Sequence, residues 1–238
     1  AEGRAAAARA VAAACEEHGF FKVTGHGVPV ELLARVEAAA AAFFALQQRE
    51  KEAAMSAASP GSPFGYASKR IGNNGDLGWV EYLLLGVTAA GASTGDHSAD
   101  APLSVPAEEA VPSEWRCSFR DLLNEYTVAV RRMACSVLEL MAEGLGMEES
   151  DAFARLVLHE DSDSMLRVNH YPPRPEQKQL HGGAGGNGRV TGFGEHTDPQ
   201  IISVLRSNST SGLEIALRDG SWVSVPPDQS SFFVNVGD

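Results

Sequence analysis

A histidine and an aspartate, His196 and Asp198, stand one residue apart and form the feature of this sequence with the clearest chemical meaning. The residues from Gly194 to Leu205 alternate as in a β-strand, and residues two apart on a strand point to the same face. An imidazole nitrogen and a carboxylate oxygen side by side are two of the three ligands of the facial triad that holds non-haem iron(II). The triplet alone does not decide between a metal site and two polar side chains without a metal, so the elements that would position it matter.

A second set of polar residues, Arg167, Asn169 and Tyr171, has the same two-residue spacing on a predicted strand, Met165–Tyr171. Three polar side chains on one buried strand face would need polar partners, and a bound dicarboxylate could provide them. The alternative is a sheet face that is exposed to water. The two prolines that follow Tyr171 end the strand in either case.

Helices dominate the first part of the chain and strands the last part, as judged from the spacing of apolar residues. Apolar residues three and four apart predict helices over 3–18, 30–46 and 115–140, with residues 49–55 as a continuation of the second helix. A shorter helix is expected over about 148–156. Alternating residues predict strands over 20–23, 81–87, 165–171, 194–205, 213–217, 222–225 and 232–236, with Asp219 and Gly220 as a hairpin turn. This order predicts an α+β fold with a double-stranded β-helix (jelly-roll) core, braced by N-terminal and central helices. We interpret residues 1–112 as an N-terminal helical and strand region, and residues 113–238 as the long helix and the first part of the jelly-roll domain.

Stretches rich in small and polar residues separate these elements. Residues 56–78 are expected to be ordered but irregular, with Phe64 and Tyr66 as aromatic anchors. Residues 88–112 are poor in large apolar side chains, which predicts a mobile surface connection. The glycine-rich run 181–189 predicts a loop between strands rather than a phosphate cradle, because no helix start follows it.

The composition narrows the class of partner. Acidic residues outnumber basic ones, 31 to 19, for a net charge of -12, which argues against nucleic acid or anionic lipid as partners. No apolar run reaches the roughly 20 residues of a membrane span. Cys15, Cys117 and Cys135 lack CxxC spacing and lie in predicted helices, so we expect reduced core residues in a cytoplasmic protein. A small acidic ligand would need a local basic site, and a homo-oligomer is left open.

Several motifs together resemble the plant iron(II)- and 2-oxoglutarate-dependent dioxygenases. Their N-terminal signature, their N-x-Y-P-P strand and their iron motif are matched by Gly19–Phe21 with Gly25–Pro29, by Asn169–Pro173 and by His196–Asp198. Within that superfamily, the segments Phe64–Tyr66, Lys69–Gly72, Gly78–Leu85 and His196–Asn208 are similar to gibberellin 2-oxidases in particular. The resemblance extends over nearly the whole chain.

The resemblance implies a function and a set of site residues. His196 and Asp198 would bind Fe(II), and Tyr171 would hydrogen-bond the co-substrate 2-oxoglutarate, with Asn169 close to it. The reaction implied consumes 2-oxoglutarate and O2 and hydroxylates C2 of a gibberellin. The hydroxylated hormone would be inactive, so the role implied is gibberellin catabolism.

Gibberellins are carboxylic acids on an apolar skeleton, so their pocket should be apolar and contain one cation. We expect Lys69 or Arg70, beside Phe64 and Tyr66, to provide the substrate contacts. The alternative is that these basic side chains are solvated on a loop. Five other histidines are expected to be surface or capping residues: His18, His97, His159, His170 and His181.

The family pattern also contains a second iron histidine, roughly fifty to sixty residues after the first, and beyond it an arginine and a serine that hold 2-oxoglutarate. The chain ends at Asp238, before those positions. We therefore expect a jelly roll that is incomplete at its C-terminal end and a polypeptide that is inactive as given. Two alternatives stay open: a related plant dioxygenase that acts on another gibberellin position or metabolite, and a non-catalytic jelly-roll binding module.

Overall fold

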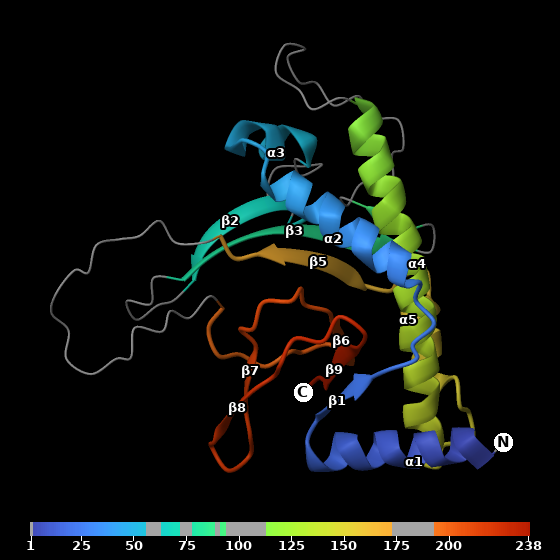
Figure 1. Ribbon diagram of the computed structural model, residues 1–238. Helices are drawn as coiled ribbons and strands as arrows, with labels where there is room; N and C mark the ends of the chain where they lie inside the picture. Colours follow the sequence, from blue (N-terminus) through green and yellow to red (C-terminus); the bar gives the residue numbers. More distant parts are fainter. Residues whose placement is uncertain (1, 56–62, 72–77, 89–90, 94–112, 173–192) are drawn as a thin grey trace, which may run out of the picture. The chain divides into compact units, whose positions relative to one another are not determined.

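The computed structural model describes residues 2–55, 63–71, 78–88, 91–93, 113–172 and 193–238 (Figure 1). In space the chain forms two compact units, each assembled from segments that are far apart in the sequence. The first unit combines Ala1–Ala38, Leu122–Ser162 and Thr197–Asp238, and the second combines Ala39–Asp121 and Asp163–His196. The proposed boundary after residue 112 divides the chain along its sequence, which is a different division from these spatial units.

The helices are α1 (Glu2–Glu17), α2 (Val30–Phe44), α3 (Gln48–Ala54), α4 (Ser113–Gly144) and α5 (Ala152–Leu158). The positions of α1, α2, α4 and α5 were predicted, although α5 begins a few residues later than expected. α3 is a separate helix, whereas a continuation of α2 was expected there. Gly146 ends the turn after α4: its φ is 72°, and the N–H of Met147 bonds the carbonyl of Ala142 at 3.0 Å. In the described part of the chain, no helix has both the length and the apolar character that crossing a membrane requires.

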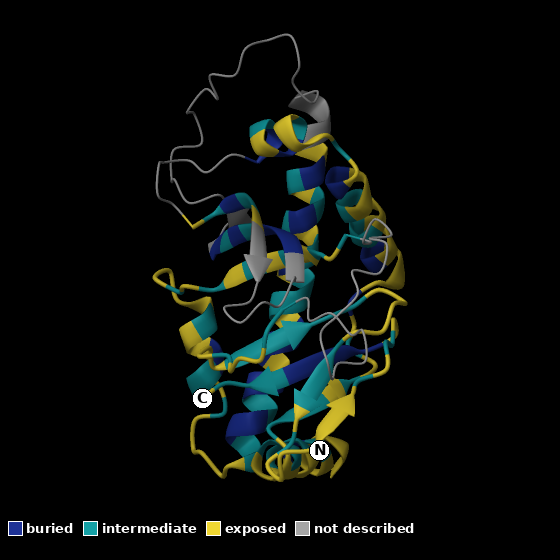
Figure 2. Ribbon diagram, turned by 90° about the vertical axis from the view of Figure 1, so that its left-hand side faces the viewer, coloured by how far each residue is buried: buried dark blue, intermediate teal, exposed yellow. Residues whose placement is uncertain are grey.

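A three-stranded antiparallel sheet lies in the first unit, in the order β1 (Phe20–Val23), β9 (Phe232–Val236) and β6 (Ile202–Leu205). The middle strand, β9, is the most deeply buried, and Phe232 is fully covered where it packs with Leu33 of α2 and Leu138 of α4. Buried residues recur among exposed ones along α2 and α4, and Figure 2 colours the ribbon by burial. A separate hairpin pairs β7 (Glu214–Ala216) with β8 (Trp222–Ser224), as the Asp219-Gly220 turn predicted.

The second unit contains an antiparallel sheet built on β3 (Gly78–Thr88). This strand pairs with β2 (Gly65–Ile71), β4 (Gly91–Ser93) and β5 (Met165–His170), and β2, β3 and β5 run side by side in Figure 1. Leu83 at the middle of β3 is fully buried, and Phe43 stacks on Phe119 with 5.7 Å between ring centres. The unit therefore has a core of its own.

Three expectations need correction. The strand expected over 194–205 begins only at Ile202, and Pro199 explains part of the difference because it has no N–H for a ladder bond. The segment expected to be irregular contains β2, which lacks a clean apolar alternation and is a strand because it pairs with β3 over seven residues. Cys117 is exposed rather than buried, whereas Cys135 is buried, and all three cysteines are free thiols. Residues 56–62, 72–77, 94–112 and the glycine-rich run 181–189 lie outside the described residues.

Candidate functional site

His196 lies in the second unit, outside any helix or strand, and it is exposed. Its Nδ1 atom is 2.7 Å from the backbone oxygen of Gly194. A carbonyl oxygen only accepts hydrogen bonds, so Nδ1 carries a hydrogen, and in the neutral ring the lone pair is on Nε2. A hydrogen bond from Nδ1–H to a carbonyl is the usual support for a histidine that binds a metal through Nε2. The donor chemistry of His196 therefore fits a metal ligand.

Asp198 belongs to the first unit, where the C-terminal end of β9 fixes its backbone. The N–H of Asp238 donates to the carbonyl of Asp198 at 3.0 Å, and the N–H of Gly237 donates to that of Ile201 at 3.2 Å. Gly237 is required at this point, because a Cβ atom there would overlap the carbonyl oxygen of Gln200. A half-buried carboxylate is thus held on a backbone anchored to the most buried strand of the unit.

The alternation predicted for β5 is confirmed. Arg167 and Asn169 are exposed along one face of the strand, and Tyr171, which follows the strand, is 50% exposed. Leu166 and Val168 on the opposite face are partly buried. Within the described part of the chain, this polar face is thus open rather than buried.

Two aromatic rings hold the guanidinium of Arg167. Its Cζ atom lies 4.2 Å from the ring centre of Tyr82 and 5.0 Å from that of Phe193. The ring of Phe193 also meets the imidazole of His196 edge-on, with 4.3 Å between the ring centres. Partial burial raises the pKa of the Tyr171 hydroxyl, and the nearby charge of Arg167 acts to lower it; burial has the larger effect. The hydroxyl is therefore neutral at physiological pH and can donate a hydrogen bond.

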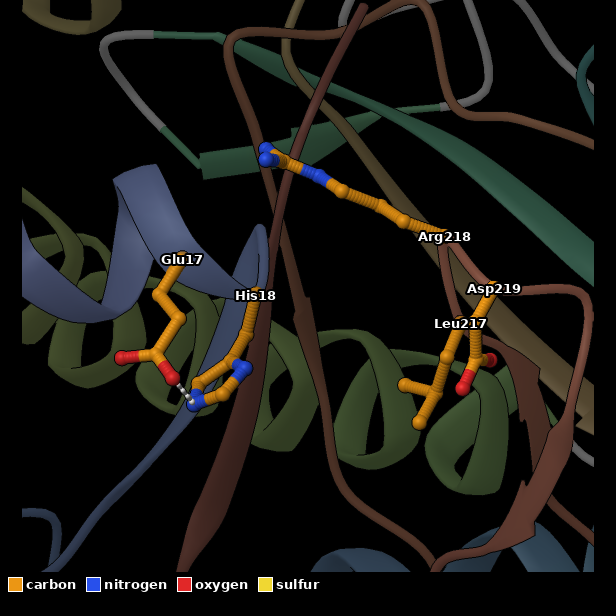
Figure 3. A pocket seen from close by; sticks show the side chains of 5 residues that line it. All are labelled: Glu17, His18, Leu217, Arg218 and Asp219. Atoms are coloured by element: carbon orange, nitrogen blue, oxygen red, sulfur yellow. Dashed lines mark ion pairs between the residues drawn. The ribbon is translucent and has the colours of Figure 1, made fainter.

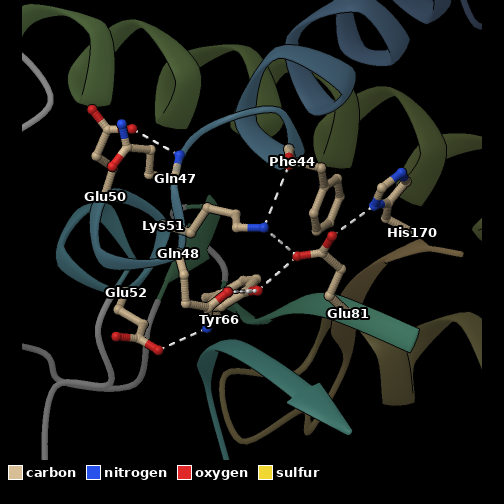
Figure 4. A network of polar contacts seen from close by, with 9 residues as sticks. All are labelled: Phe44, Gln47, Gln48, Glu50, Lys51, Glu52, Tyr66, Glu81 and His170. Atoms are coloured by element: carbon tan, nitrogen blue, oxygen red, sulfur yellow. Dashed lines mark hydrogen bonds and ion pairs between the residues drawn. The ribbon is translucent and has the colours of Figure 1, made fainter. Parts of the chain in front are cut away.

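A buried carboxylate joins four elements of the second unit (Figure 4). Glu81 of β3 accepts hydrogen bonds from Lys51 Nζ of α3 at 2.5 Å and from the Tyr66 hydroxyl of β2 at 2.6 Å. His170 Nδ1 of β5 lies 2.8 Å from its other oxygen, and the His170 ring stacks on Phe44. Only 6% of Glu81 and 7% of Lys51 are exposed. Burial acts to raise the pKa of Glu81, but the bonds from Lys51, Tyr66 and His170 outweigh it and hold the pKa below its ordinary value.

This Glu81 cluster was not recognised in the sequence, and the expectation that His170 is a surface or capping residue is wrong. One signal was present: Glu81 is the only charged residue in the otherwise apolar run Trp79–Leu85. Its partners could not be assigned from that run alone, because they come from other elements. Its β5 member, His170, is the residue immediately before Tyr171. His170 is also the last residue of β5, where it pairs with Glu81.

The structure places the predicted substrate residues on or next to β2. The hydroxyl of Tyr66 is engaged by Glu81, and burial followed by that bond raises its pKa. Phe64 is partly buried at the entrance to the strand. Lys69 and Arg70 lie on β2 in register with Val80 and Trp79, so they are strand residues and not loop residues. Their side chains lie outside the described part of the structure.

A shallow hollow of about 240 Å³ on the first unit is lined by Glu17, His18, Leu217, Arg218 and Asp219 (Figure 3). It contains none of the predicted site residues, so we do not assign the chemistry to it. Among the described residues, no group of three or more His, Cys, Asp or Glu side chains is arranged to hold a metal.

Comparisons with known proteins point in one direction. Residues 1–108 match the family described as the non-haem dioxygenase in morphine synthesis N-terminal region, and residues 162–238 match the 2OG-Fe(II) oxygenase superfamily. The gibberellin 2-beta-dioxygenase 1 of Pisum sativum is 51% identical over 94% of this chain. The gibberellin 2-beta-dioxygenase of Phaseolus coccineus is 52% identical over the same share. The chain spans 61% of the length of each of these relatives.

Solved structures share the fold. A 2OG-Fe(II) oxygenase family protein from Caulobacter crescentus aligns with 100% of this chain and 71% of its own, with a TM-score of 0.73 and 25% identity. JOX2, solved in complex with 2OG, Fe and JA, aligns with 96% of this chain and 60% of its own, with a TM-score of 0.69 and 24% identity. These likenesses confirm the expected α+β fold with the jelly-roll core of such oxygenases.

Proposed function

The chain belongs to the iron(II)- and 2-oxoglutarate-dependent oxygenases, and from that premise we propose that its protein is a gibberellin 2-beta-dioxygenase. The proposed reaction hydroxylates C2 of gibberellins with O2 and 2-oxoglutarate and so inactivates the hormone. About half of the residues are identical to enzymes with that name over nearly all of the chain, which supports this choice. Fe(II), 2-oxoglutarate and O2 are the cofactor and co-substrates of the family.

We assign His196 and Asp198 as iron ligands of this chain. The observation that supports the assignment is the hydrogen bond from His196 Nδ1 to Gly194, because it leaves Nε2 as the nitrogen that would bind the metal. Asp198 would supply a carboxylate oxygen from a backbone that β9 holds in place. Iron bound at this site, with 2-oxoglutarate and O2, supplies the oxidant for C–H hydroxylation.

Tyr171 and Asn169 are the proposed 2-oxoglutarate contacts. The side chain of Asn169 is exposed on β5, and that of Tyr171 is exposed just after the strand, so both can meet a ligand. The raised pKa of Tyr171 keeps its hydroxyl protonated, as donation to a carboxylate requires.

For the gibberellin itself we keep Lys69, Arg70, Tyr66 and Phe64 as proposed contacts. Because Tyr66 donates its hydroxyl to Glu81, its contribution would come from the ring and from the shape of β2. Free thiols and the acidic charge favour a cytoplasmic protein whose partner is a small molecule, with neither nucleic acid nor membrane as a partner.

The test is product analysis on the full-length protein. With Fe(II), O2 and 2-oxoglutarate, the wild type should convert gibberellins to 2-hydroxylated products, identified by mass spectrometry across a panel of gibberellins. His196→Ala and Asp198→Ala should form no product, whereas His18→Ala, which changes an exposed histidine in the Figure 3 hollow, should remain active. Hydroxylation at another carbon, or consumption of 2-oxoglutarate only with other metabolites, would contradict the C2 assignment. No consumption of 2-oxoglutarate at all would favour the binding-module alternative.

A further inference from the structure

Among the described residues, the guanidinium of Arg167 contacts aromatic rings and no carboxylate. Other basic residues, such as Arg4, Arg35 and Arg206, form ion pairs with glutamates. Across the described ranges, no carboxylate pairs with the Arg167 guanidinium, which contacts aromatic rings instead. In a protein with a net charge of -12, a cation held in this way is suited to an external anion.

The aromatic contacts prepare this guanidinium for binding. Both rings lie within the roughly 6 Å over which a cation is attracted to a π-face. A stacked guanidinium keeps its N–H donors in its own plane, where they can form a fork with a carboxylate. Because the rings already restrict the side chain, less conformational entropy is lost when a ligand binds.

The position of Arg167 relates it to the proposed reaction. It shares the exposed face of β5 with Asn169 and precedes Tyr171 by four residues. The ring of Phe193, which contacts the guanidinium, also contacts His196. A ligand carboxylate bound to Arg167 would therefore lie in the same unit as the residues proposed for 2-oxoglutarate and as His196.

We propose that Arg167 binds the carboxylate of the gibberellin substrate and makes the enzyme selective for the free acid. This inference rests on the proposed function. The flanking rings of Tyr82 and Phe193 favour the hormone over 2-oxoglutarate as the ligand of Arg167, because an apolar skeleton can pack against them and a small dianion cannot. Arg167 then provides the basic contact that the acidity of the substrate requires, a role for which Arg70 and Lys69 are the competing candidates.

The experiment compares a gibberellin with its methyl ester, which keeps the skeleton and removes the charge. Binding to the full-length protein is measured by anaerobic calorimetry with Fe(II) and 2-oxoglutarate, and KM is measured for each substrate. Arg167→Met should weaken binding of the acid roughly tenfold and leave binding of the ester unchanged, because one charge-assisted contact is lost. Arg167→Lys should fall between wild type and Arg167→Met. Arg35→Met, which breaks an exposed ion pair with Glu125, is the matched control and should bind the acid normally.

The results for the different variants and ligands distinguish a role of Arg167 in gibberellin binding from other roles. Equal losses for acid and ester in Arg167→Met would mean a packing role and would overturn the proposal. A raised KM for 2-oxoglutarate with unchanged gibberellin affinity would assign Arg167 to the co-substrate instead. A selective loss of acid binding in Arg70→Ala, with none in Arg167→Met, would transfer the role to β2. Selective binding of the acid through Arg167 without a hydroxylated product would refute the proposed function but support the role of Arg167. A wild type that binds no gibberellin would refute both the proposed function and the role of Arg167.

Discussion

Replacing Lys51 by methionine is the most informative test of the Glu81 cluster. The substitution keeps the length and the apolar stem of the side chain but removes the ammonium group that donates to Glu81 at 2.5 Å. Glu81 is only 6% exposed, so water cannot replace that partner. Loss of one member of a buried ion pair typically destabilises a protein by about 3–5 kcal/mol.

Protonation of Glu81 limits the loss of stability that Lys51→Met can cause. Without Lys51, Glu81 can avoid an unpaired buried charge by taking up a proton. For a carboxyl with an ordinary pKa of 4.5, protonation at pH 7 costs about 3.4 kcal/mol, since each pH unit corresponds to about 1.4 kcal/mol. Tyr66 and His170 still bond the carboxyl, so we expect Lys51→Met to lower the free energy of unfolding by about 3 kcal/mol at pH 7.

The pH dependence gives the sharper result. In the wild type the pKa of Glu81 is lowered, so its contribution to stability is present above the ordinary value of 4.5 and is lost only as the pH falls below it. In the variant the pKa is raised, and the folded state takes up a proton that the unfolded state lacks. The difference in the free energy of unfolding between the wild type and Lys51→Met should therefore decrease by about 1.4 kcal/mol for each pH unit from pH 7 towards pH 5.

Urea unfolding of the full-length protein, followed by circular dichroism at pH 5, 6 and 7, measures this gap. Arg35→Met is the matched control, because it breaks an exposed pair and should cost less than about 1 kcal/mol at every pH. The double variant Lys51→Met/Glu81→Gln should be less sensitive to pH than the single one. A Lys51→Met penalty no larger than the control, or one that does not change with pH, would refute the view that Glu81 is a buried, charged partner.

Three further predictions follow from the site and its supports. Hydrogen bonds, first from the Ser230 side chain, hold the pKa of Asp228 at about 2, below its ordinary value of 3.8. The stabilisation that they provide is therefore present above pH 3.8 and is lost as the pH falls towards 2. In Asp228→Asn, Tm should fall less steeply than in the wild type over that pH range. Gly237→Ala should lower the free energy of unfolding by about 1–3 kcal/mol in chemical denaturation, because its Cβ would overlap a backbone carbonyl. Gly212→Ala, with open space around it, should change stability little. Tyr171→Phe should raise KM for 2-oxoglutarate roughly tenfold with a smaller change in kcat, and an unchanged KM would remove its hydroxyl from the co-substrate site.

The elements with regular apolar spacing were predictable, and the pairing between distant segments was not. The strand at Phe232–Val236 and the shared face of Arg167 and Asn169 were predicted because a period of two needs only local sequence. β2 was missed because its pairing with β3, and not its own pattern, makes it a strand. The predicted strand at His196 was wrong, because a proline three residues later interrupts pairing.

The candidate site shows the same division. His196 and Asp198 were recognised from their types and spacing, which is local information. The Glu81 cluster was missed because its partners lie 15, 30 and 89 residues away in the sequence, and only the fold brings them together. The contacts of Arg167 with the rings of Tyr82 and Phe193 could not be predicted from the sequence for the same reason.

Metal binding tests the central assignment most directly. Metal-free full-length protein, titrated anaerobically with Fe(II) in the presence of 2-oxoglutarate, should bind one ion by calorimetry. His196→Ala and Asp198→Ala should each abolish or strongly weaken that binding, while His18→Ala should retain it. Unchanged Fe(II) affinity in both ligand variants would show that the iron is held elsewhere and would contradict the account of this site.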